Sequence, residues 1–178
     1  MAIIWDPNIL HIEGFFSSQH TLSGGFRILG TTHEGVVTNV YGPKSLDKKL
    51  SFLNHLSWLN SRIPYQNWII GGYLNILTSL TEKKGGIRRL DRDSFALQAL
   101  IRDLKLADLQ TNNGVYTWNN RRGGERQVAS RLDKFIILDT LLQNHINLSA
   151  AILPMAGSDH WPICLLMDLG RKRSWKTS

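Results

Sequence analysis

Cysteine is almost absent from this 178-residue chain, which contains only Cys164. One thiol excludes an internal disulfide, and it leaves neither a zinc site nor cysteine catalysis credible. The setting of Cys164 among Pro162, Ile163 and Leu165 favours a small buried hydrophobic residue. No apolar run approaches the roughly 20 residues of a membrane span, and no signal peptide pattern opens the chain. We therefore expect an intracellular protein without a membrane segment.

Acidic residues are also few, since 14 Asp and Glu face 21 Lys and Arg and give a formal net charge of +7. Such a surplus favours polyanionic partners, because Lys and Arg neutralise phosphates and release condensed counterions. Two basic stretches surround the pairs Gly85-Gly86 and Gly123-Gly124, which indicates exposed loops. These loops are either solvated or in contact with phosphates. A basic tail over 169–178 is either a nuclear address or solubilising charge.

Four segments place polar residues at the ends of short apolar runs. The run Trp68–Ile70 leads through Gly-Gly to Tyr73 and Asn75, and Val36–Val40 ends at Tyr41-Gly42-Pro43. Further along, Ser130-Arg131-Leu132-Asp133 precedes an apolar run, as does Ser158-Asp159-His160. Apolar runs of this length bounded by Gly and Pro are typical of buried strands. The pattern predicts a cleft built from polar groups at strand ends.

The remaining chain alternates between further strands and helices. Leucine spacing predicts a helix capped by Ser45 that ends near Asn60, with leucines 46, 50, 53, 56 and 59 on its apolar face. Asp91 is a predicted cap for a second helix whose Phe95, Leu97, Leu100, Ile101 and Leu104 face inward. Strands are predicted at Ile3–Trp5 and about Gly25–Leu29, and a shorter helix from Asp139 or Thr140 to Asn144.

In their order and spacing the four polar segments resemble the endonuclease/exonuclease/phosphatase family, specifically the endonuclease domain of plant LINE-type (non-LTR) retrotransposons. The resemblance runs from about Ile3 to about Met167. It also includes Trp5-Asp6-Pro7, the stretch Thr38–Pro43, and Tyr116-Thr117-Trp118-Asn119-Asn120. Each triplet alone is weak, but the joint order is specific.

The resemblance implies an α+β fold: a DNase I-like, four-layer sandwich of two mainly antiparallel sheets with helices on the outer faces. We expect one domain over 1–168 followed by the tail. The family's opening strands, which carry an Asn and a metal-binding Glu, have no counterpart in this sequence. The resemblance therefore implies a domain that is truncated at its N-terminal side, degenerate, and uncovered at one sheet edge.

The chemistry implied by the resemblance is hydrolysis of DNA phosphodiester bonds with Mg²⁺, because a hard cation polarises the phosphoryl group. His160 would contact the scissile phosphate and Asp133 would orient its ring. Asp159 would lie near the metal or its water. Asn75 would hydrogen-bond a phosphate oxygen or the attacking water, and Tyr41 would donate its hydroxyl to the phosphate. Taken one at a time, each residue has an ordinary structural explanation.

Tyr73 departs from the family motif, which would read Gly-Asp-Phe-Asn where this chain has Gly72-Tyr73-Leu74-Asn75. A phenol that stays protonated near neutral pH does not replace a carboxylate base. We therefore expect slight or no activity from a retrotransposon-derived endonuclease. The alternatives are a catalytically dead module that still binds nucleic acid and, less favoured, a phosphatase-type member of the family.

Contacts with DNA are expected from arginines 121, 122, 126 and 131. Trp118 lies beside this basic stretch and could stack on a base, but its large apolar area favours packing in the core. A protein that acts on genomic DNA would work in the nucleus. Oligomeric state has no signal in the sequence.

Overall fold

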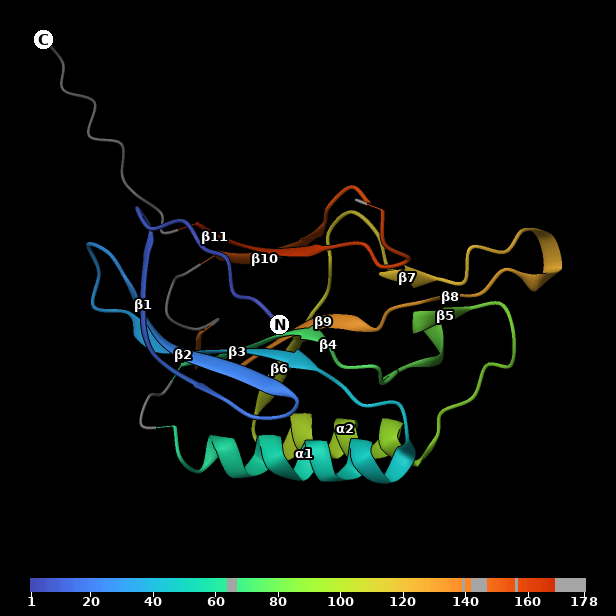
Figure 1. Ribbon diagram of the computed structural model, residues 1–178, viewed down its shortest axis with the longest axis horizontal. Helices are drawn as coiled ribbons and strands as arrows, with labels where there is room; N and C mark the ends of the chain where they lie inside the picture. Colours follow the sequence, from blue (N-terminus) through green and yellow to red (C-terminus); the bar gives the residue numbers. More distant parts are fainter. Residues whose placement is uncertain (64–66, 139, 142–146, 156, 169–178) are drawn as a thin grey trace, which may run out of the picture.

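A central six-stranded sheet lies between a layer of two helices and a small two-stranded sheet (Figure 1). The computed structural model describes residues 1–63, 67–138, 140–141, 147–155 and 157–168. Both of its long helices, α1 (Leu46–Asn60) and α2 (Arg92–Asp103), cover the same face of the central sheet. The basic tail 169–178 and most of the short helix predicted near Asn144 lie outside the described residues.

The central sheet has the strand order β1-β2-β3-β4-β9-β6. Its strands are β1 (Leu10–Ser17), β2 (Thr21–Ile28), β3 (Glu34–Tyr41), β4 (Trp68–Tyr73), β6 (Leu106–Leu109) and β9 (Asp133–Leu138). Among the described strand pairs of this sheet, β3 and β4 alone are parallel, and α1 makes the crossover between them. The C-terminal ends of β3 and β4 therefore meet at the same edge of the sheet.

Two smaller sheets complete the described structure. One pairs β10 (Asn147–Ile152) with β11 (Ile163–Asp168), and the other has the order β5-β8-β7. The members of the second sheet and the flanking short helices are β5 (Lys83–Lys84), β7 (Trp118–Asn119), β8 (Ala129–Ser130), η1 (Leu80–Glu82) and η2 (Gly124–Arg126). The β7–β8 hairpin, with η2 at its tip, projects from one end of the molecule (Figure 1).

The larger hydrophobic core lies between the helices and the central sheet. Leu56 and Leu97 from the helices are fully buried against Trp68, Ile70 and other sheet residues. Burying one such side chain stabilises the fold by about 1.5–3 kcal/mol. The predicted helix faces are confirmed at most positions, but Phe95 is 58% exposed and Leu46 is 43% exposed. Leu46 is the first residue of α1, and Phe95 lies in the first turn of α2.

On the opposite face of the sheet, a smaller core lies under β10 and β11. Its fully or nearly buried members are Ile12, Phe26, Ile28, Ile69, Ile137 and Leu141. Leu148, Leu165 and Met167 from β10 and β11 are only partly buried against them. The two-stranded sheet therefore buries its apolar side chains less completely than the helices do.

The N-terminal segment differs from the sequence prediction. Residues Ile3–Trp5 are not a strand; they lie against the second core through Ile3 and Trp5. The first strand, β1, instead covers His11 and the polar stretch that follows, and it pairs with β2. Alternation of Ile12 with polar neighbours is the period-two pattern that explains this strand. No described helix is long and apolar enough to cross a membrane.

Candidate active site and DNA-contacting surface

Three of the polar positions form a row across neighbouring strands. Tyr41 at the end of β3 is the register partner of Tyr73 in β4, and Tyr73 is the partner of Asp133 in β9. Directly paired residues project from the same face of a sheet. This face is the one that packs on β10 and β11, because Ile69 and Ile137 of the same strands lie in that core. The predicted convergence of strand ends is thus present.

His160 joins this row from the loop before β11. Its Nδ1 lies 2.8 Å from Asp133 Oδ2, with 30% of the His160 side chain and 13% of the Asp133 side chain exposed. Burial raises the pKa of Asp133, although the hydrogen bond with His160 opposes the shift. Nε2 of His160 makes no hydrogen bond within the described residues. An oriented imidazole with one open nitrogen can bind a phosphate oxygen.

Tyr73 lies at the centre of the row. Its ring meets the His160 ring edge to face, with centroids 4.9 Å apart, and it lies 5.2 Å from the Tyr41 ring. Burial, followed by electrostatic interactions with Tyr41, Asp133 and Asp159, raises the pKa of Tyr73 to about 12. The phenol therefore stays protonated at neutral pH and cannot accept a proton. Tyr41, in contrast, is 56% exposed and accessible to a ligand.

Asp159 lies beside this site, but its carboxylate has a protein partner. Nε1 of Trp118 donates a hydrogen bond of 2.8 Å to Asp159 Oδ2. This hydrogen bond and the nearby charges of His160 and Arg121 lower the pKa of Asp159. Trp118 is only half-buried, so the predicted role in the core is wrong in part: the indole anchors Asp159.

Asn75 ties together the loops that follow β3 and β4. It adopts a left-handed backbone with φ of 58°, and its Nδ2 donates to the Pro43 carbonyl at 2.9 Å. Close contact between these loops also requires glycine at position 42, because an added Cβ would lie 2.1 Å from the Leu74 carbonyl oxygen. Asn75 lies near the row, but one amide hydrogen is committed to the backbone.

The sequence matches no protein-family model and no curated protein, whereas solved structures are similar in fold. The endonuclease domain of TRAS1, a telomere-specific non-LTR retrotransposon, aligns with a TM-score of 0.67 at 19% identity, over 93% of this chain and 72% of that one. A protein of the endonuclease/exonuclease/phosphatase family from Bacteroides thetaiotaomicron gives 0.57 at 12% identity, over 93% and 69%. TDP2 from D. rerio, complexed with a single-strand DNA product, gives 0.55 at 11% identity, over 88% and 68%.

This chain has the DNase I-like α/β sandwich fold. The predicted fold class is confirmed, with the two long helices α1 and α2 on one face of the central sheet. The similar structures are endonuclease/exonuclease/phosphatase-type domains.

The donors near the row do not fit a protein-held Mg²⁺ in this DNase I-like domain. Within the described ranges, no three His, Cys, Asp or Glu side chains form a group that could hold a metal ion. Asp133 bonds His160, Asp159 bonds Trp118, and Tyr73 offers a protonated phenol in place of a carboxylate. Mg²⁺ prefers several hard, charged oxygen ligands. We therefore derive no step through a metal.

Arg131 is buried and not exposed on the surface, which corrects the sequence prediction that it contacts DNA. Its side chain is 1% exposed and forms hydrogen bonds with Glu82 Oε1 at 2.7 Å and Asp108 Oδ1 at 2.6 Å. Lys134, equally buried, also bonds Glu82. Two buried cations are thus paired with two carboxylates on the helix-facing side of the sheet. Basic residue spacing alone could not distinguish this network from exposed charge.

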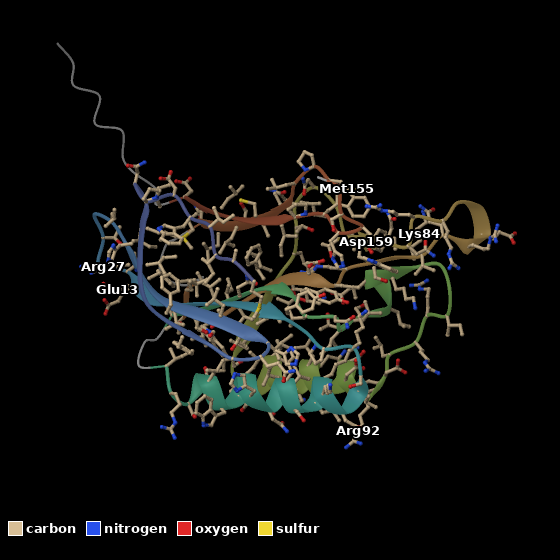
Figure 2. All side chains as sticks on the ribbon, in the orientation of Figure 1. Glu13, Arg27, Lys84, Arg92, Met155 and Asp159 are labelled. Carbon is tan, nitrogen blue, oxygen red and sulfur yellow. The ribbon has the colours of Figure 1, made fainter. Side chains whose placement is uncertain are left out.

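The other three predicted arginines lie on the surface of the β7–β8 hairpin. Arg121, Arg122 and Arg126 are exposed. Arg121 Nη2 donates to the Gly157 carbonyl at 2.8 Å, which holds the guanidinium beside Asp159 and the site. Asp159 lies at the same end of the domain as this hairpin (Figure 2). The hairpin can therefore present positive charge next to the row.

Thr117 is a site residue that the role assignments from sequence missed. It is fully buried, and its Oγ1 accepts hydrogen bonds of 3.0 Å from the backbone N–H groups of Leu132 and Asp133. These bonds fix the start of β9 and therefore the Asp133 carboxylate. The sequence shows Thr117 next to Trp118, but no local pattern indicates that the Thr117 hydroxyl contacts the start of another strand.

Proposed function

We propose that this chain is a retrotransposon-derived endonuclease-like domain that binds DNA phosphodiesters and hydrolyses them poorly or not at all. The Asp133–His160 pair carries the proposal, because an oriented, partly exposed imidazole with a free Nε2 is suited to a phosphate oxygen. The TRAS1 endonuclease domain and the DNA complex of TDP2 share the fold and support DNA as the substrate class.

In this proposal, Asp133 accepts a hydrogen bond from the Nδ1–H of His160, and this bond fixes the orientation of the ring. Protonated His160 would then donate from Nε2 to a phosphate oxygen, and Tyr41 would donate its exposed hydroxyl to the same group. Arg121, Arg122 and Arg126 would follow the neighbouring phosphates. The groups bind and orient the phosphodiester.

Weak hydrolysis follows from Tyr73. A phenol with a pKa of about 12 is ionised in only about one molecule in 10⁵ at pH 7, so it rarely accepts a proton from water. The same observation favours a second candidate, a module that binds nucleic acid without cleaving it. In both cases the site selects phosphodiesters, and the difference lies in the rate of cleavage.

Plasmid binding and nicking test the proposal together. We expect supercoiled plasmid to bind at low salt, to dissociate steeply as salt rises, and to show little nicking with or without magnesium. Any nicking by the native chain should vanish in His160→Ala. The Tyr73→Asp variant tests whether a carboxylate raises the nicking rate.

Two results would contradict the proposal. Failure of folded protein to bind DNA at low salt removes the DNA-binding function itself. Rapid nicking by the native chain that vanishes in His160→Ala would show an efficient enzyme and overturn the role assigned to Tyr73. Binding without nicking in every variant selects the non-cleaving module.

A further inference from the structure

A hollow of about 660 Å³ lies on the reverse side of the short segments that carry His160 and Trp118. Its walls come from the loop before β7, the end of β10 and the β5–β8–β7 sheet. Its volume is in the range of small-molecule sites. The residues that decide its chemistry are Lys84, Tyr116, Asn119, Gln127, Leu153 and Trp161.

Strand register separates this hollow from the candidate active site. Asn119 pairs with Ala129, and Ala129 pairs with Lys84, so the three side chains share one face of the small sheet. All three line the hollow. Trp118, the neighbour of Asn119 in β7, projects to the other face, where it bonds Asp159.

The segment around His160 alternates in the same way. Trp118 and His160 form an antiparallel bridge, and the next residue, Trp161, lines the hollow. The Trp161 N–H donates to the Thr117 carbonyl at 2.8 Å, and Thr117 holds the backbone of Asp133. The two sites thus share two backbone segments while facing opposite ways.

The chemistry of the hollow suits a nucleotide. Tyr116 and Trp161 offer aromatic surface, while the Asn119 Nδ2 group, the Gln127 amide and the Lys84 ammonium make no hydrogen bond or ion pair with a described side chain. No Asp or Glu of the described ranges lines the hollow. Aromatic stacking, free amides for a base edge and an unopposed cation for phosphate are the features of single-strand binding sites.

Figure 2 shows Lys84 and Asp159 towards the end of the molecule from which the hairpin projects. Arg122 and Arg126 are exposed on the same hairpin, and Arg126 directly precedes Gln127 of the hollow. A polyanionic strand would therefore meet positive charge on its path from the row to the hollow.

We propose that this hollow binds one unpaired nucleotide of a bound DNA strand. The base stacks on Tyr116 or Trp161, its edge bonds Asn119 and Gln127, and its phosphate lies near Lys84. This assignment rests on the proposed DNA-binding function and adds a second contact on the opposite face from His160.

The test uses the full chain and a fluorescein-labelled single-stranded oligonucleotide of roughly twelve nucleotides, with one abasic site moved along it. Anisotropy should show that the native chain loses roughly 5- to 100-fold in affinity at one abasic position, the range of base–aromatic stacking. Trp161→Leu should weaken binding of the intact oligonucleotide to a similar degree, and it should no longer respond to that abasic position. Gln127 is exposed. In the Gln127→Ala variant, the same abasic site should reduce affinity by less than it does in the native chain.

Lys48→Gln is the control, because Lys48 is exposed on α1, in the layer remote from the hollow. It should keep the native response to the abasic site. If the native chain binds DNA but no abasic position matters, or if Trp161→Leu and Gln127→Ala both respond as the native chain does, the hollow is not a nucleotide site and the proposed function stands. If no oligonucleotide binds at low salt, both proposals fail.

Discussion

Asp133 and Lys134 are consecutive in β9, yet their charges meet opposite surroundings. Lys134 faces the helix side, fully buried, within a network of two cations and two carboxylates. Asp133 faces the β10–β11 side, where its partner is a histidine that is 30% exposed. Burial would raise the pKa of Glu82 in the network, but Lys134 and Arg131 lower it. In Asp133 burial dominates, and the pKa is raised.

The difference separates a structural use of charge from a functional one. In the network, two positive charges balance two negative charges, and nearly every polar atom has a partner. Removing one member therefore leaves the others without a partner in a buried site. In the site, Asp133 holds one ring while the far nitrogen of His160 stays open within the described residues. An incompletely paired group keeps its capacity to bind a ligand, and it contributes less to folding.

Neutralising Glu82, the carboxylate that bonds both Arg131 and Lys134, should give the largest loss of folding stability. Glu82→Gln leaves Arg131 and Lys134 short of an anion in a buried site, and breaking a buried pair costs about 3–5 kcal/mol. With an m value near 2 kcal/mol/M, the urea midpoint should fall by about 2 M. Glu34→Gln, at an exposed position on β3, is the matched control and should change stability by less than about 0.5 kcal/mol. Equal midpoints for both variants would show that the network does not stabilise the fold.

This network marks the limit of what the sequence could predict. The helices, the strands that follow them and the convergence of Tyr41, Asp133 and His160 follow from local periodicity and motif order. The pairing of Arg131 with Glu82 and Asp108 joins positions 49 and 23 residues apart, and nothing local specifies it. Arg131 therefore looked like one more surface cation.

The failures at β1 and Trp118 have a related cause. The polar residues of β1 look like a loop until β2 pairs with them, and the pairing supplies the backbone hydrogen bonds that the sequence does not show. Trp118 is large and apolar enough for the core, yet its indole N–H finds Asp159, 41 residues away. Tertiary partners, which local patterns do not encode, decided both cases.

The same carboxylate-to-amide change at Asp133 should alter the free energy of unfolding less than Glu82→Gln does, and in the opposite direction. Because the folded pKa is raised above the ordinary 3.8, the native state favours the protonated form, and this stability is lost as pH rises through the folded pKa. Asp133→Asn should therefore gain stability relative to the native chain as pH rises from 3.8 towards neutral. Urea unfolding of both proteins at pH 4 and pH 7 measures this difference. If Asp133→Asn were instead less stable relative to the native chain at pH 7 than at pH 4, His160 would stabilise the Asp133 charge more than burial opposes it.

The Tyr73 hydroxyl should affect stability only in alkaline solution. Its folded pKa of about 12 exceeds the ordinary 10.0, so the unfolded phenol ionises first as pH rises, and the native chain loses stability from about pH 10 towards 12. Tyr73→Phe has no such proton, so its unfolding free energy should fall less over this window. The same two proteins at pH 8 provide the baseline, because the phenol is then protonated in both states. Parallel curves from pH 8 to pH 11 would show that the Tyr73 hydroxyl is solvated in the folded chain and free to ionise, and the explanation offered for weak hydrolysis would lose its basis.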